Sequence, residues 1–124
     1  MKKILIVDDE PNIVMTLEYT FKKSNYEVFI ARDGQEALDI LKTNFPDVII
    51  LDIMMPMVDG FATLEQIRKD TNLQHTKVMF LSAKNKESDI EKGLALGADA
   101  YMTKPFSIKK VVEKVEELLD NKII

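Results

Sequence analysis

The chain contains no cysteine, no tryptophan and a single histidine among its 124 residues. The absence of cysteine excludes disulfide bonds, thiolate metal ligands and a cysteine nucleophile. One histidine cannot build a metal site that needs several imidazole ligands. The sequence also lacks a long hydrophobic run, because the apolar stretch at residues 4–7 ends at acidic residues. That stretch is too short for a signal peptide or a membrane span, so we expect a cytoplasmic protein without membrane contact.

An excess of positive charge is also missing. The sequence has 21 acidic side chains against 17 basic ones, which gives a net charge of −4. This balance disfavours broad contact with a phosphate backbone, so we expect no direct nucleic-acid partner. With 46% hydrophobic residues the chain can bury a core, and its length fits one domain over residues 1–124.

Short apolar runs alternate with stretches that carry apolar residues at helical spacing. The runs are residues 4–7, 28–31, 48–51, 77–81 and 99–102. Continuous apolar runs are typical of strands that are buried on both faces. Ile13, Leu17 and Phe21 show the helical spacing that follows the first run. The alternation predicts an α/β fold: a five-stranded parallel sheet in the order 2-1-3-4-5, doubly wound with five helices.

Acidic residues follow two strands that this order makes neighbours. Asp8 and Asp9 come after the first strand, and Asp52 comes after the third. We therefore expect the three carboxylates in one crevice at the switch point of the sheet. Two carboxylates 4 Å apart repel by about 1 kcal/mol even in bulk water. A cation relieves that repulsion, and oxygen ligands with room for water and phosphate oxygens suit Mg²⁺.

The next two strands end at groups that complement the acids. Ser82 offers a hydroxyl, and Lys104 offers a compact positive charge. An aspartate nucleophile, a metal, a hydroxyl and an ammonium together suit phosphoryl chemistry. Each residue also has a purely structural interpretation: an aspartate or serine after a strand often caps a helix, and a lysine is most often solvated. The structural interpretation weakens when these residues converge at one edge of the sheet.

The residues resemble a bacterial two-component response-regulator receiver domain, of the stand-alone type found in chemotaxis, over residues 3 to about 119. The matching segments are residues 4–10, Asp52 with 55–60, 81–83, 97–99, Tyr101 and 104–106. The resemblance implies a flavodoxin-like fold. It also implies that Asp52 accepts a phosphoryl group from a sensor histidine kinase or a phosphotransfer protein. Asp8, Asp9, Asp52 and the backbone carbonyl of Met54 would then hold Mg²⁺.

The same resemblance assigns the remaining site residues. Ser82 and Tyr101 correspond to the pair that switches on phosphorylation, and Lys104 corresponds to the lysine that pairs with the phosphate. The Lys104–Pro105 bond is cis in the family. Phosphorylation would bias the face formed by the fourth helix, fifth strand and fifth helix, which a downstream protein target reads. The chain would catalyse only its own phosphorylation and dephosphorylation, so we expect a signalling receiver rather than an enzyme.

Further expectations concern lifetime and contacts. Met54 and Lys84 correspond to the positions that flank the path of the attacking water in the family. Neither can orient water well, so we expect a long-lived phospho-form.

Kinase contact is expected on the first helix, at Asn12, Thr16 and Thr20, which share one side. Ala100 and the lysines of the last helix depart from the pattern of winged-helix regulators that dimerise. We therefore expect a stand-alone monomer that acts through protein contact, with a receiver of a phosphorelay equally open and phosphorylation-dependent dimerisation also left open.

Two alternatives remain open. The first is a Mg²⁺-dependent phosphohydrolase with an aspartyl-phosphate intermediate. Such an enzyme usually needs a second acid two residues after its nucleophile, where this chain has Met54. The second is a docking receiver that works without phosphorylation, which the presence of all five key side chains disfavours.

Overall fold

The computed structural model describes residues 1–120 as an α/β domain, and the last four residues of the predicted domain lie outside the described residues. The strands are β1 (Lys3–Val7), β2 (Glu27–Ala31), β3 (Val48–Leu51), β4 (Lys77–Ser82) and β5 (Ala100–Thr103). The helices are α1 (Pro11–Lys23), α2 (Gly34–Ile40), α3 (Gly60–Lys69), α4 (Glu87–Ala95) and α5 (Ile108–Leu119), with a 3₁₀ turn, η1, at Thr71–Leu73. The predicted runs therefore match the strands to within one residue at each end, and η1 was not predicted.

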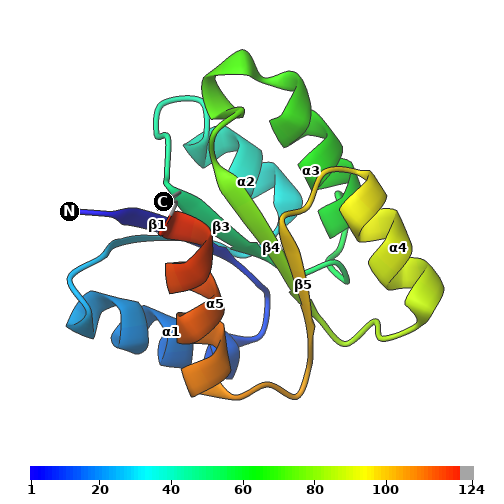
Figure 1. The fold of residues 1–124 in the computed structure, drawn as a ribbon. Helices are drawn as coiled ribbons and strands as arrows, with labels where there is room; N and C mark the ends of the chain where they lie inside the picture. Colours follow the sequence, from blue (N-terminus) through cyan, green and yellow to red (C-terminus); the bar gives the residue numbers. More distant parts are fainter. Residues whose placement is uncertain (121–124) are drawn as a thin grey trace.

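The sheet is parallel throughout and has the order β2-β1-β3-β4-β5, which confirms the predicted topology (Figure 1). The register aligns the carboxyl ends of the central strands, because Val7 pairs with Leu51, and Leu51 pairs with Phe80. Ser82, the last residue of β4, pairs with Thr103 at the end of β5. The residues that follow these strands consequently meet at one edge of the sheet.

Helices cover both faces of the sheet, so each strand contributes side chains to two hydrophobic cores. Leu5 and Val7 of β1 point into the core that contains residues of α2 and α3, while Ile4 and Ile6 point into the core beneath α1 and α5. Figure 1 shows α1 and α5 on one side of the sheet and α2, α3 and α4 on the other. This two-sided burial explains why the strands read as continuous apolar runs.

Local signals set the helix ends. Asp33 caps α2 by accepting a hydrogen bond from the Glu36 backbone at 2.8 Å, and the Glu36 carboxylate accepts one from the Arg32 backbone at 2.9 Å. Gly97 follows α4 with φ +110°, a left-handed conformation that glycine adopts without a Cβ clash.

Among the described residues, no helix combines the length and apolar character needed to cross a membrane.

Candidate functional site

Two aspartates lie at the carboxyl edge of the sheet because β1 and β3 are neighbours. Asp8 donates its backbone N–H to the Ala31 carbonyl at 3.1 Å, and Asp52 donates to the Val7 carbonyl at 2.9 Å. Each residue is only 3% exposed. Two carboxylates buried this deeply need a cation or a proton between them.

Lys104 supplies a cation to this pocket. It follows β5 and precedes Pro105, to which it is joined by a cis peptide bond. Its Nζ lies 3.0 Å from Asp8 Oδ2 and 3.4 Å from Asp52 Oδ2. A third and shorter contact, 2.8 Å, runs to Oε1 of Glu10. One ammonium therefore contacts three carboxylates.

The acidic cluster of the described residues consists of Asp8, Glu10 and Asp52, each with a carboxylate oxygen within 4.8 Å of the others. Asp8 and Asp52 were predicted for this pocket, and Glu10 was missed. Asp9 is exposed and lines a neighbouring hollow beside α1, and the Met54 side chain is 56% exposed. The signal for Glu10 was available as a third acid directly after the predicted pair.

Burial and charge pull the site's pKa values in opposite directions. Burial raises the pKa of the Asp8 carboxyl, and hydrogen bonds from the Glu10 backbone and from Lys104 only partly offset it. For Lys104, burial lowers the pKa, but its hydrogen bonds to Glu10 and Asp8 outweigh that effect and leave the pKa raised. The lysine therefore stays charged, and an added cation would favour ionised Asp8.

The two predicted switch residues both contact Lys84, in the loop after β4. Ser82 is fully buried, and its Oγ accepts a hydrogen bond from the Lys84 backbone N–H at 3.2 Å. The Tyr101 hydroxyl donates to the Lys84 carbonyl at 2.7 Å. Burial raises the pKa of the Tyr101 phenol, so the group is a hydrogen-bond donor at neutral pH. Movement of this loop therefore changes contacts of both residues.

Aromatic contacts connect Tyr101 to the segment around Asp52. The Tyr101 ring lies 5.7 Å from the Phe80 ring, and Phe80 makes an edge contact with Phe61 at 5.6 Å between centroids. Phe61 follows Gly60, the first residue of α3. A Cβ added at Gly60 would lie 2.3 Å from the carbonyl oxygen of Asp52, so only glycine allows α3 to approach this closely.

The predicted kinase contact residues lie along α1. The Thr16 hydroxyl donates to the Asn12 carbonyl and the Thr20 hydroxyl to the Thr16 carbonyl, each at 2.8 Å. Met15 and Tyr19 on the same helix are 66% and 68% exposed, although both side chains are largely apolar. Sequence reasoning did not single out these two residues, which lie outside the predicted apolar stripe of Ile13, Leu17 and Phe21.

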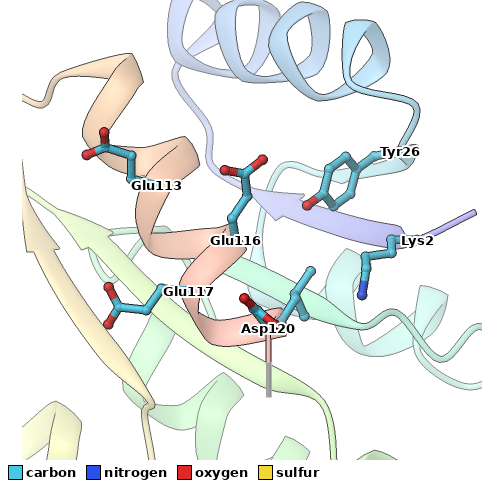
Figure 2. Close-up of a pocket in the computed structure, with 7 residues that line it drawn as sticks. Lys2, Tyr26, Glu113, Glu116, Glu117 and Asp120 are labelled. Atoms are coloured by element: carbon cyan, nitrogen blue, oxygen red, sulfur yellow. The ribbon is translucent and has the colours of Figure 1, made fainter. Parts of the chain in front are cut away.

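A second hollow lies at the opposite end of the sheet, where α5 approaches the start of the chain (Figure 2). It is lined by Lys2, Tyr26, Glu113, Glu116, Glu117, Leu119 and Asp120. Lys2 precedes β1 whereas Asp8 follows it, so this hollow is separate from the acidic pocket. Burial raises the pKa of Tyr26, and the charges of Glu116 and Asp47 add to that effect.

The doubly wound sheet, with buried carboxylates and a lysine at its switch point, places the chain among α/β proteins that bind ligands at the carboxyl ends of the strands. Residues 4–116 match the family described as "Response regulator receiver domain". The chain therefore belongs to the response regulator receiver domain family.

Relatives and solved structures agree with this assignment. The chain is 46% identical over 118 residues to the alkaline phosphatase synthesis transcriptional regulatory protein PhoP of Bacillus subtilis (strain 168), a match covering 95% of this chain and 48% of that protein. It therefore spans about half the length of PhoP.

Two solved structures share the fold closely. The Francisella response regulator 1452 receiver domain is 37% identical with a TM-score of 0.88, over 96% of this chain and 97% of that one. The chemotaxis response regulator CheY4 of Vibrio cholerae is 31% identical with a TM-score of 0.90, over 96% and 99% of the two chains.

Membership of this family defines the general role of the chain. Receiver domains are the phosphorylation-switched signalling modules of two-component systems, and they interact with histidine kinases or phosphotransfer proteins. They bind Mg²⁺ at a cluster of acidic residues, which here contains Asp8, Glu10 and Asp52.

Proposed function

We propose that this chain is a phosphorylation-activated switch that accepts a phosphoryl group on Asp52 from a histidine kinase or a phosphotransfer protein. The observation that carries the proposal is the Asp52 carboxylate, buried beside Asp8 and within 3.4 Å of the Lys104 ammonium. A buried aspartate is shielded from bulk water and can act as a nucleophile toward phosphorus, and a fixed cation nearby can pair with the incoming phosphoryl oxygens.

The transfer exchanges one bond for another. A carboxylate oxygen of Asp52 forms a bond to phosphorus, and the bond from phosphorus to the donor's imidazole nitrogen breaks. The imidazole leaves with the electron pair of that bond. The Lys104 ammonium then pairs with oxygens of the bound phosphoryl group, which adds negative charge next to the 3.0 Å Asp8 contact.

Asp8 and Asp52, together with the predicted ligands Asp9 and the Met54 carbonyl, would hold Mg²⁺. The donors are hard oxygens, and the carboxylate oxygens of Asp8 and Asp52 lie close enough to share one divalent ion, whereas the neighbouring Glu10 carboxylate pairs with Lys104. When bound, the ion neutralises carboxylate and phosphoryl charge. The raised pKa of the Asp8 carboxyl fits a site in which a cation is needed for full ionisation.

The output of the switch would pass through Lys84. Phosphorylation draws Ser82 toward the new phosphoryl oxygens, which strains the Ser82 contact with the Lys84 backbone. The Tyr101 hydroxyl donates a hydrogen bond to the Lys84 carbonyl. The loop that leads into α4 and the strand β5 therefore respond together. A downstream protein that prefers one arrangement of α4, β5 and α5 reads the phosphorylated state.

Kinase contact is proposed for the exposed face of α1. Asn12, Thr16 and Thr20 offer polar contacts there, and the exposed side chains of Met15 and Tyr19 offer apolar area on the same helix. Exchanging these residues for those of another receiver should redirect kinase preference in a phosphotransfer assay. Unchanged preference after the exchange would contradict this contact.

The alternative of a phosphohydrolase lacks a second catalytic acid. The residue two positions after Asp52 is Met54, whose thioether cannot act as a general acid or base. A docking receiver without phosphorylation would have no need for a buried Asp8, Asp52 and Lys104 in mutual contact.

Incubation with a small acyl phosphate and Mg²⁺, followed by intact mass measurement, tests the proposal. We expect a mass increase of one phosphoryl group that disappears on removal of Mg²⁺ and in the Asp52→Asn variant. Asp39→Asn, an exposed carboxylate on α2, is the matched control and should retain the increase. Turnover of a phosphate ester without a stable adduct would instead support the phosphohydrolase.

A further inference from the structure

Glu10 directs its side chain to the phosphorylation pocket rather than to the helix that it begins. It occupies the N-cap position of α1, where a side chain usually accepts hydrogen bonds from the first turn. Within residues 1–120, its carboxylate makes no such capping bond. It instead contacts Lys104, 94 positions further along the chain, at 2.8 Å.

The three partners of Lys104 differ in both distance and burial. The contact with Glu10 is the shortest at 2.8 Å, and the contact with Asp52 is the longest at 3.4 Å. The Glu10 side chain is 57% exposed, whereas the Asp8 and Asp52 side chains are 4% exposed. Glu10 is therefore the one partner of the three that can follow the ammonium when the buried carboxylates gain a metal or a phosphoryl group.

We propose that Glu10 is a positioning residue for Lys104, which draws the ammonium away from the Asp52 carboxylate and holds it at the mouth of the pocket. This inference rests on the proposed phosphorylation of Asp52. A carboxylate that is paired closely with an ammonium is a weaker nucleophile, because its charge is already neutralised. An ammonium held beside Glu10 leaves Asp52 free to attack and stands where the phosphoryl oxygens arrive.

Loss of Glu10 should therefore slow phosphorylation without weakening the metal site. At saturating Mg²⁺, Glu10→Gln is expected to slow the mass gain from a small acyl phosphate by roughly fivefold, the scale of a partly exposed ion pair. Calorimetric titration with Mg²⁺ should give a Kd within about twofold of the unsubstituted protein, because Lys104 neutralises the exposed Glu10 charge. Asp8→Asn should raise that Kd by roughly tenfold or more.

A double-mutant cycle with Lys104→Met isolates the route of the effect. If Glu10 acts through Lys104, adding Glu10→Gln to Lys104→Met causes no further slowing. Where Lys104→Met reacts too slowly to time, the same cycle is measured by urea unfolding without metal, in which the two substitutions must be non-additive. Glu18→Gln removes the same charge from α1 and should leave the rate unchanged.

Three results would overturn the role of Glu10 while leaving the proposed function intact. The first is binding of Mg²⁺ by Glu10→Gln that is as weak as binding by Asp8→Asn. The second is additive effects of the Glu10 and Lys104 substitutions, and the third is slowing of phosphorylation by Glu18→Gln equal to that by Glu10→Gln. Absence of a Mg²⁺-dependent mass gain in the unsubstituted protein would overturn the proposed function and the role of Glu10 with it.

Discussion

Replacement of Lys104 by methionine removes the cation of the acidic pocket and keeps a side chain of similar length. The Lys104 side chain is 11% exposed and those of Asp8 and Asp52 are 4% exposed, so solvent screens these contacts poorly. Two unit charges 3 Å apart attract by roughly 5 kcal/mol at an effective dielectric constant of about 20, before desolvation is subtracted. Removing one partner of a buried pair typically costs about 3–5 kcal/mol.

Proton uptake by Asp8 recovers part of that cost. Without divalent ions at pH 7, the variant should therefore lose about 2–3 kcal/mol of unfolding free energy, which is at or below the lower end of the range for a broken buried pair. Urea unfolding measures this loss directly. A carboxyl group whose pKa is raised in the folded state binds more protons when folded, so the stability that it contributes increases as pH falls through the raised pKa. The deficit of the variant should therefore shrink on acidification.

Mg²⁺ should also reduce the deficit, because the ion stabilises the folded state that it binds and should bind more tightly when Lys104 no longer competes for Asp8 and Asp52. Lys114→Met is the matched control, since Lys114 pairs with Glu117 on the surface of α5 and should contribute at most about 1 kcal/mol. Equal stability of Lys104→Met and the unsubstituted protein at pH 7 would show that Lys104 does not stabilise the buried carboxylates. A deficit that grows on acidification would contradict the proton uptake by Asp8.

Three further predictions follow from the same pocket. Gly60→Ala should destabilise the fold by about 1–3 kcal/mol in urea unfolding, because its Cβ would lie 2.3 Å from the Asp52 carbonyl, whereas an unhindered helix would gain stability from alanine. Asp8→Asn should be more stable than the unsubstituted protein at pH 7 without metal, since burial raises the pKa of the Asp8 carboxyl; thermal melts should show this advantage fading as pH falls toward 4. The phospho-form should last minutes or longer by intact mass, and Met54→Asn should shorten its lifetime by supplying an amide that orients water. A lifetime of seconds in the unsubstituted protein would contradict that expectation.

The strands were predictable from sequence because their physical cause is local, and their order was predictable because right-handed crossovers leave few topologies for alternating strands and helices. A parallel sheet covered on both faces requires continuous apolar runs, and residues 48–51 are buried throughout as that rule demands. Asp8 and Asp52 were placed together by the strand order alone, since both follow neighbouring strands.

The missed features depend on contacts between distant segments. The Glu10 side chain can contact Lys104 only once β1 and β5 are part of the folded sheet. Helix-capping rules for position 10 therefore do not predict that contact. The need for glycine at position 60 arises from the approach of α3 to the Asp52 carbonyl, although φ there requires none. Met15, Met54 and Met57 are exposed in the folded chain, and the sequence pattern around them does not indicate this.

We propose that Asp52 receives a phosphoryl group in a pocket completed by Asp8 and Lys104. The most direct test of this proposal is peptide mapping by mass spectrometry of the protein after reaction with an acyl phosphate and Mg²⁺. We predict one phosphoryl group, located on Asp52 and absent without the metal. A phosphoryl group on another residue, or undiminished labelling of Asp52→Asn, would contradict this account.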